Sequence, residues 1–331
     1  MDTQRRRFNQ LGVAAAALAA APQVRAQRDP AANFPSRPVR LIIPFAPGGG
    51  TDIVGRAIGD KLGQEWGQPV VVENKAGANG TIGADMVVKS PPDGYMMCMF
   101  TASHSVNVTL QGKQQPYDLF KDFAPLSLLA VQPYILVVRP GLPVKSVADL
   151  VALAKAKPGT INFGSSGVGG LIHLCGELFQ ARAGIKLAHI PYKGGSQAMM
   201  DVIAGNIDMM FTSLNQSKTY IDAGQLRLLA VTSAKRSPVA PDIPTMQEAG
   251  VPDYEVESWY GLAAPAAVPK PILAKLNTSI DRVLKLPDVR ERLAADGSTP
   301  VGGSAERFGT FLRNEVEKWR ALIDQVGIPV G

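Results

Sequence analysis

The sequence predicts an α/β fold with two domains, and three observations lead to this prediction. Short apolar stretches alternate with segments whose apolar residues recur every three or four positions, which is typical of repeated strand–turn–helix units. The 331 residues exceed what one hydrophobic core usually holds. The chain has 33 glycines and 26 prolines but no low-complexity tract, which indicates many tight turns.

The first 26 residues have the composition of an export signal. Arg5–Arg7 precede an alanine-rich, weakly apolar stretch, Leu11–Ala21, and the segment ends on Val24–Ala26. A basic start, a short apolar middle and a small-residue end are typical of a removable signal peptide. The Arg-Arg-x-Phe pattern resembles a twin-arginine signal, and a general secretory signal fits as well. We expect a mature protein that begins near Gln27 and works in a bacterial periplasm.

Three strand–turn–helix units follow the signal. Repeated units of this length favour a parallel sheet that helices cover on both faces. The predicted elements here are strands 39–45, 70–72 and 95–100, with helices 53–66 and 81–89.

The same pattern restarts after residue 130. The predicted strands are 134–138, 161–163, 188–192, 207–211 and 226–232, with one helix that begins at Leu171 and another that ends at Gly205. A strand over 255–263 and helices over 269–284 and 305–326 follow, the last with Ser304 as its N-cap. These terminal helices lack strands of their own, so we expect them to pack on the first sheet. Domain 1 is then 34–130 plus 252–331, and domain 2 is an insertion over 131–251.

Charge and composition exclude several classes of protein. The net charge is +6, and half of it comes from the four Arg and one Asp of residues 1–26, so a strongly basic nucleic-acid binder is excluded. Two Cys and three His, without metal-ligand spacing, predict neither a metal site nor a cofactor. No apolar run of 18 residues occurs, so no membrane span is expected. Export would permit a disulfide, but we interpret Cys98 and Cys175 as two buried thiols.

At least five predicted strands end in a turn of Gly, Ser, Thr or Asn that opens into a helix. In parallel α/β sheets these turns line the crevice beyond the carboxyl ends of the strands. Helix N-termini there favour an anion. One such turn is explained by capping alone, whereas several in both domains indicate two facing rims of a cleft. The hydroxyls that could cap a helix or bind a carboxylate are those of Thr51, Thr101, Ser103, Ser165, Ser166 and Ser196.

Catalytic signatures are absent from these turns. Gly48–Gly50 match neither a dinucleotide-binding nor a phosphate-loop motif, and the turn after strand 161–163 lacks the spacing of a nucleophile elbow. We therefore predict no catalytic residue. We interpret His173 as a polar residue on the outer face of a helix, and His189 as structural. His104 either touches the ligand or is structural.

Asp52 lies in the first turn of a predicted helix. It could hold the ammonium group of a ligand. We favour the structural interpretation, in which its carboxylate stabilises the positive end of the helix dipole.

The stretch Pro44–Asp52 (Pro-Phe-Ala-Pro-Gly-Gly-Gly-Thr-Asp) resembles the Bug family of periplasmic solute receptors, the extracytoplasmic component of tripartite tricarboxylate transporters. The resemblance extends in consistent order over about 34–328. Its further motifs lie at 73–80, 92–95, 117–125, 164–167, 173–179, 191–194, 230–237, 244–250 and 259–261.

The resemblance implies a two-domain clamshell of the type II periplasmic binding protein kind. It also implies a carboxylate held by main-chain amides and bridging waters from both domains. The implied binding residues are Gly49, Gly50, Thr51, Asn79, Thr101, Ser103, Ser165, Ser166, Gly167, Gly195 and Ser196. Thr212 stands where many relatives have Asp, which argues against an amino-acid ligand, and Gly169, Gly170 and Gly195 also depart from the usual residues.

The expected function is that of a monomeric receptor that captures a small organic acid and delivers it to the membrane subunits of a transporter, without a cofactor. A periplasmic sensory protein that feeds a signalling system is the alternative. A serine hydrolase that uses Ser165 or Ser166 is the least favoured, because the sequence offers no credible base.

Overall fold

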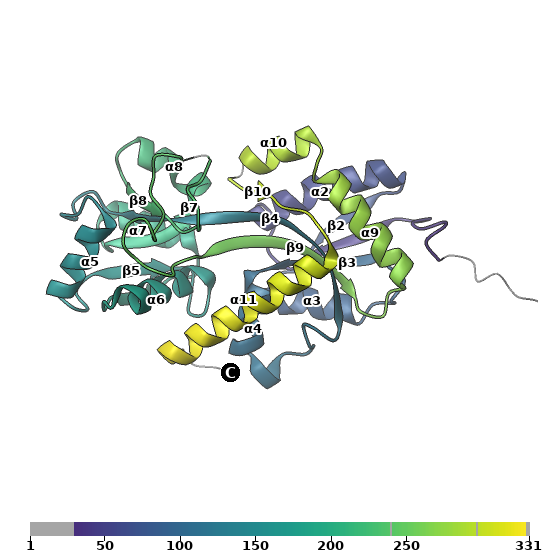
Figure 1. Cartoon of the computed structure of the whole chain (residues 1–331), viewed down its shortest axis with the longest axis horizontal. Helices are drawn as coiled ribbons and strands as arrows, with labels where there is room; N and C mark the ends of the chain where they lie inside the picture. The colour runs from purple at the N-terminus through teal and green to yellow at the C-terminus, as the bar shows by residue number, and fades with distance from the viewer. Residues whose placement is uncertain (1–29, 239, 296, 329–331) are drawn as a thin grey trace, which may run out of the picture.

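The computed structural model of the chain describes residues 30–238, 240–295 and 297–328, and the predicted export signal lies outside these ranges. Two groups of helices and strands are joined by two long central strands (Figure 1). We call the part built on β1 (Val39–Ile43), β2 (Val70–Asn74) and β3 (Met96–Thr101) the first lobe. The second lobe is built on β5 (Asn162–Ser165), β6 (Ala188–Pro191), β7 (Met209–Ser213) and β8 (Arg227–Val231).

The two central strands, β4 (Phe123–Val138) and β9 (Glu257–Pro265), connect the lobes. They pair antiparallel from Phe123 against Pro265 to Pro133 against Glu257. Residues 260–263 of β9 pair with β3 of the first lobe. The last residues of β4 pair with β7 and β8 of the second lobe. The strand order is β2-β1-β3-β9-β4-β7-β5-β6, and β8 and the short β10 (Thr299–Pro300) also pair with β4.

The outer strands follow the predicted parallel arrangement, since β1 pairs parallel with β2 and β3, and β5 with β6 and β7. The central strands run antiparallel to their neighbours, so the sheet as a whole is mixed. The first-lobe helices are α2 (Gly50–Trp66), α3 (Thr81–Val88) and α4 (Ala102–Leu110). The second-lobe helices are α5 (Val147–Ala156), α6 (Leu171–Ala183), α7 (Gly195–Ala204) and α8 (Leu214–Asp222).

Three helices follow β9: α9 (Lys270–Val283), α10 (Pro287–Ala295) and α11 (Ala305–Val326). Ser304 caps α11 as predicted, because its Oγ accepts a hydrogen bond from the Arg307 N–H at 3.2 Å. Helix α11 crosses from one lobe to the other (Figure 1). Its first half packs in a core of the first lobe and its second half in the core of the second. The predicted domain boundaries stay a prediction.

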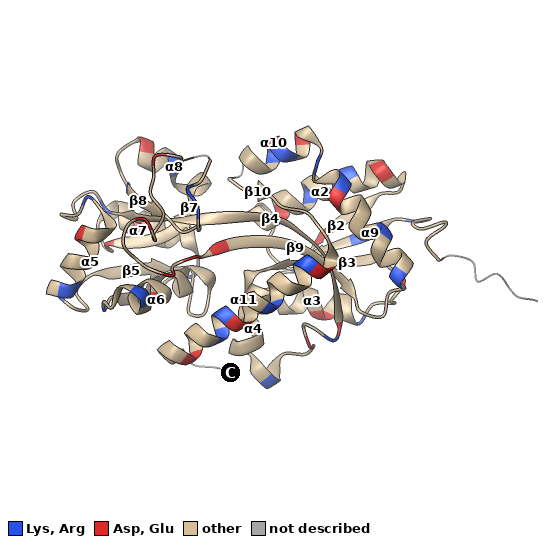
Figure 2. Ribbon diagram, viewed as in Figure 1, with Lys and Arg blue, Asp and Glu red and all other residues tan. Residues whose placement is uncertain are grey.

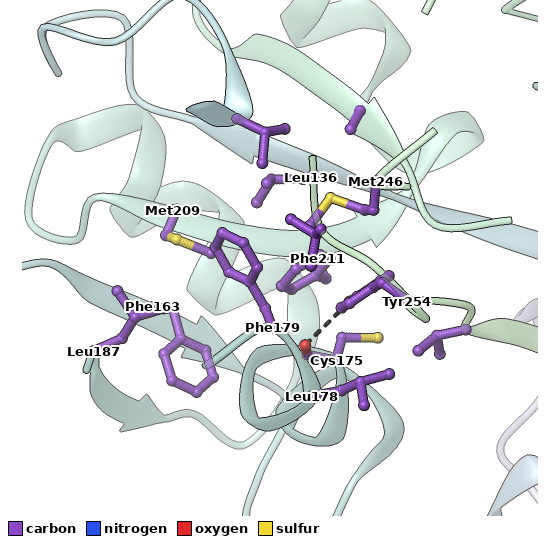
Figure 3. Packing of buried hydrophobic residues seen from close by; sticks show 14 of the residues in the cluster. Leu136, Phe163, Cys175, Leu178, Phe179, Leu187, Met209, Phe211, Met246 and Tyr254 are labelled. Atoms are coloured by element: carbon purple, nitrogen blue, oxygen red, sulfur yellow. Dashed lines mark hydrogen bonds between the residues drawn. The ribbon is translucent and has the colours of Figure 1, made fainter. Parts of the chain in front are cut away.

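The second-lobe core is built mostly of Leu, Val and Ile, and aromatic and sulfur-containing side chains pack among them (Figure 3). The Tyr254 hydroxyl donates a hydrogen bond to the main-chain carbonyl of Cys175 at 3.0 Å, and its ring stacks on Phe211. Cys175 and Cys98 are both buried and unpaired, which confirms the predicted free thiols, and burial raises the pKa of each thiol. In the part of the chain that the structure describes, no helix combines the length and apolarity that a membrane span requires.

Candidate cleft between the lobes

A cavity of about 380 Å³ lies where the two lobes face each other across β4 and β9. Its lining comes from both lobes and from the central strands. None of the lining residues carries a charged side chain. Lys, Arg, Asp and Glu lie mainly on the helices and connecting loops around the lobes (Figure 2).

The first-lobe rim consists of the starts of α2 and α4. Gly49 is the N-cap of α2, and Gly50 and Thr51 begin the helix. Thr101 is the N-cap of α4, whose first residues also line the cavity. The preceding turn needs glycine at Gly48, where φ is +86°, a conformation that other residues rarely adopt.

Asp52 fixes the turn before α2 and is 5% exposed. Its carboxylate accepts hydrogen bonds from the Gly48 N–H, Arg56 Nε and Asn74 Nδ2, each at 3.0 Å. Burial alone would raise the pKa of this carboxyl, but the bonds from Arg56, Gly48 and Asn74 outweigh it and hold the pKa below its usual value. Because its partners are all within the first lobe, the geometry supports the structural interpretation.

The second-lobe rim consists of the starts of three helices. Leu171 and Ile172 begin α6, and Gly195 and Ser196 begin α7. The third helix, α8, contributes its N-cap Ser213 together with two amide side chains, Asn215 and Gln216. Each helix starts where a strand of the second lobe has ended, which brings the three starts to one edge of the sheet.

Five helix N-termini therefore meet at one uncharged cavity, two from the first lobe and three from the second. Each carries main-chain N–H groups without an intrahelical partner and about half a positive charge. The positive potential of the cavity comes from the main chain rather than from lysine or arginine. Such an arrangement suits a small anion such as a carboxylate.

The floor of the cavity consists of polar side chains on the central strands: Gln132 and Tyr134 on β4, and Ser258 and Tyr260 on β9. The Tyr260 hydroxyl donates to Gln132 Oε1 at 3.2 Å and so joins the two strands. These four floor residues are not predicted from the sequence, because no local pattern shows that two strands distant in sequence pair beneath the rims. Phe45, Ile53 and the three α8 residues of the lining were missed as well.

Seven of the predicted binding residues line the cavity: Gly49, Gly50, Thr51, Thr101, Ser103, Gly195 and Ser196. The structure does not place Asn79, Ser165, Ser166 or Gly167 in the lining. Asn79 donates through Nδ2 to Asn107 Oδ1 at 3.0 Å. The Ser165 hydroxyl is buried, accepts from the Gly167 N–H at 3.1 Å and lies 2.6 Å from His189 Nε2. Asn79 and Ser165 thus contact residues of α4 and β6, and the part of all four residues in ligand binding stays a prediction.

The three histidines lie behind the rims rather than in the cavity lining. His104 is completely buried, and the Thr101 N–H donates to its Nδ1 at 3.1 Å. The predicted position of His173 on an outer helix face is wrong, because its side chain is buried and stacks on His189 with ring centroids 4.0 Å apart. Burial and the neighbouring His173 lower the pKa of His189 to about 4. Across the described residues, no cluster of His, Cys, Asp and Glu could hold a metal ion.

Comparison with known proteins gives consistent matches. A family model described as "Tripartite tricarboxylate transporter family receptor" matches residues 54–328. The protein BugT of Bordetella pertussis is 36% identical over 296 residues, which cover 89% of this chain and 91% of BugT.

Solved structures match equally well. An R. palustris protein solved with adipate is 36% identical, with a TM-score of 0.79, and the match covers 90% of this chain and 100% of that one. MatC from Rhodopseudomonas palustris, solved with bound malate, is 30% identical with a TM-score of 0.75, over 88% and 100% of the two chains. The matches confirm the predicted two-domain α/β fold of periplasmic binding proteins.

Proposed function

Because the chain belongs to the tripartite tricarboxylate transporter receptor family, which includes the Bug proteins, we propose that it captures a small organic carboxylate between its lobes and delivers it to the membrane subunits of a transporter. The family consists of periplasmic solute-binding receptors and not of enzymes. Accordingly, the close Ser165–His189 pair holds a turn in place rather than activating a nucleophile. Export through the signal over 1–26 and action as a monomer in the periplasm belong to this proposal.

The observation that carries the proposal is the meeting of five helix N-termini at a cavity without charged side chains. A carboxylate gains charge-assisted hydrogen bonds from such N–H groups. An ammonium group would find no acidic side chain in the lining, so the cavity disfavours amino acids. Adipate and malate, found in the two similar R. palustris structures, are acids of the expected class.

The arrangement of the rims couples binding to closure of the lobes. The N-termini lie on both lobes, so one ligand bonds to all of them only when the rims approach, and it stabilises the closed form. A shift from 1% to 99% closed requires roughly 5.5 kcal/mol of differential binding. Two to four charge-assisted hydrogen bonds at about 1.5–3 kcal/mol each are sufficient.

Titration calorimetry with adipate, malate and aspartate tests the proposal. We expect saturable binding of at least one of the two dicarboxylates and no binding of aspartate. Ser196→Leu, which fills part of the rim, should weaken binding at least tenfold, because it blocks the start of α7. Thr278→Leu on α9, at an exposed residue that is not part of the cavity lining, is the control. Absence of binding by the wild type to these acids and to a wider panel of carboxylates would refute the proposal.

A further inference from the structure

Two of the three histidines occupy the same position in the two lobes. His104 follows the N-cap Thr101 of α4 by three residues, and His173 follows the N-cap Gly170 of α6 by three residues. In each helix the residues between the N-cap and the histidine line the cavity. The histidine is thus the first residue behind the rim in both lobes.

Each of these imidazoles holds the main chain at the start of its helix. The Thr101 N–H donates to His104 Nδ1 at 3.1 Å, and the Gly169 N–H donates to His173 Nδ1 at 3.1 Å. A main-chain N–H can only donate, so both Nδ1 atoms must be unprotonated acceptors. Burial lowers the pKa of His104 to about 4, which keeps its ring neutral near pH 7.

Other contacts fix the two rings from behind. His104 stacks on Phe100 with ring centroids 4.6 Å apart. His173 lies parallel to Phe163, and its Nε2 is 3.3 Å from Glu177 Oε1. The Nε2 of His104 has no hydrogen-bond partner within the described residues. An apolar ring would fill that place without leaving a buried polar atom unpaired, so the specific contribution of the imidazole is its Nδ1 acceptor.

We propose that His104 and His173 are positioning residues for the ligand, each holding a helix N-terminus of one rim in its binding geometry through the Nδ1 acceptor of its imidazole. The inference rests on the proposed carboxylate function and deepens it. Neither histidine lines the cavity, so both act through Thr101–Ser103 and Gly169–Ile172 respectively. A displacement of the main-chain N–H groups by a few tenths of an ångström weakens every hydrogen bond that they donate to the ligand.

Paired substitutions separate positioning from folding. In His104→Asn and His173→Asn the amide Oδ1 can take the place of Nδ1 and accept the same N–H. In His104→Leu and His173→Leu no acceptor remains. We expect the Leu variants to bind adipate about five- to tenfold more weakly than the wild type in calorimetry, and the Asn variants within about threefold. If His104→Leu does not fold, His104→Phe replaces it, since the ring can still stack on Phe100.

Ser146→Ala is the matched control. The Ser146 hydroxyl caps α5 by accepting from the Asp149 N–H at 3.1 Å, and α5 contributes nothing to the cavity lining. Its removal should lower the thermal midpoint without ligand but leave the Kd for adipate unchanged. Equal Kd values in the Asn and Leu variants, whether as tight as the wild type or equally weakened, would overturn the inference.

Hydrogen–deuterium exchange without ligand distinguishes this inference from the function on which it rests. We expect faster exchange at the starts of α4 and α6 in the Leu variants than in the Asn variants, because the N–H groups there lose their acceptor. If the wild type binds no carboxylate, the proposed function fails, while the exchange result still decides whether the imidazoles hold the rims. Equal exchange in both variants would contradict the inference even if adipate binds.

Discussion

A single buried imidazole should make the stability of this protein depend on pH. His104 is wholly buried, and burial lowers its pKa from about 6.5 to about 4. Between these pH values the unfolded chain binds more protons than the folded one. The stability that the neutral, buried imidazole contributes is therefore complete above about pH 6.5 and is lost as the pH falls to 4. The loss amounts to about 3 kcal/mol by pH 4, at about 1.4 kcal/mol per pKa unit.

His104→Asn removes the titrating group but keeps the acceptor. We therefore expect the free energy of unfolding of the wild type, minus that of the variant, to fall by about 3 kcal/mol between pH 7 and pH 4. Urea unfolding at a series of pH values measures this difference, and Thr278→Leu on the exposed side of α9 serves as a control whose difference from the wild type should not vary. A difference for His104→Asn that stays constant with pH would show that the imidazole does not titrate as its burial implies.

At the scale of elements, α11 is tied to the central strands by one buried carboxylate. Glu315 Oε2 accepts hydrogen bonds from two indoles, Trp259 Nε1 on β9 at 3.0 Å and Trp319 Nε1 at 3.1 Å. Lys318 forms an ion pair with the other oxygen. Both indoles are completely buried, so their N–H groups depend on this carboxylate as acceptor.

Glu315→Ala should therefore lower the free energy of unfolding by about 2–6 kcal/mol, because it leaves two buried N–H groups unpaired at about 1–3 kcal/mol each. Glu315→Gln keeps an oxygen acceptor and should lower the free energy of unfolding clearly less than Glu315→Ala does. Chemical unfolding at pH 7 measures both variants, with Glu317→Ala on the exposed side of the same helix as the control. Similar losses in Glu315→Gln and Glu315→Ala would mean that the charge, and not the acceptor, holds the indoles.

The elements that sequence periodicity predicts are those whose pattern is local. The apolar stripe of α11 and its cap Ser304 predict that helix at both ends. Only the last part of β4 is predicted, because Pro125 and Pro133 interrupt its first part. The pairing of β4 with β9 shifts register just after Pro125 and ends at Pro133. Helix α4 is missed because Ser, His, Asn, Thr and Val are weak helix formers, and tertiary packing overrides their propensity.

The residues of the candidate site also divide into those that a local sequence pattern predicts and those that depend on tertiary structure. Thr51, Thr101 and Ser196 are predictable, because the turn after a strand of an α/β sheet faces the crevice wherever the strand lies. Tyr134 and Tyr260 are not, because they face one cavity only once β4 and β9, which are distant in sequence, lie side by side in the sheet. The sequence misplaces His173 for a related reason, since the helix residue His173 is covered by His189 of strand β6.

At the scale of the whole molecule, the two lobes share structural elements rather than a flexible linker. β4 pairs with β9 on the side of the first lobe and with β7 and β8 of the second lobe, and β9 in turn pairs with β3 of the first lobe. Along α11, Phe308 and Leu312 pack in a core of the first lobe, whereas Trp319 and Leu322 pack in the core of the second. Neither lobe can unfold without exposing apolar surface that the other lobe covers. Solute capture thus takes place in a molecule whose lobes depend on each other for stability.

We therefore expect the full chain to unfold in one cooperative transition, although independent domains usually unfold separately. Scanning calorimetry should give a single peak whose calorimetric and van't Hoff enthalpies agree. A carboxylate at 100 times its Kd should add about 2.7 kcal/mol and move the whole peak to higher temperature, since it binds only the assembled cleft. Glu315→Ala loosens the helix that joins the lobes and should broaden or split the peak. Two separate transitions in the wild type, of which the ligand moves only one, would show that the lobes are energetically independent and that α11 does not couple them.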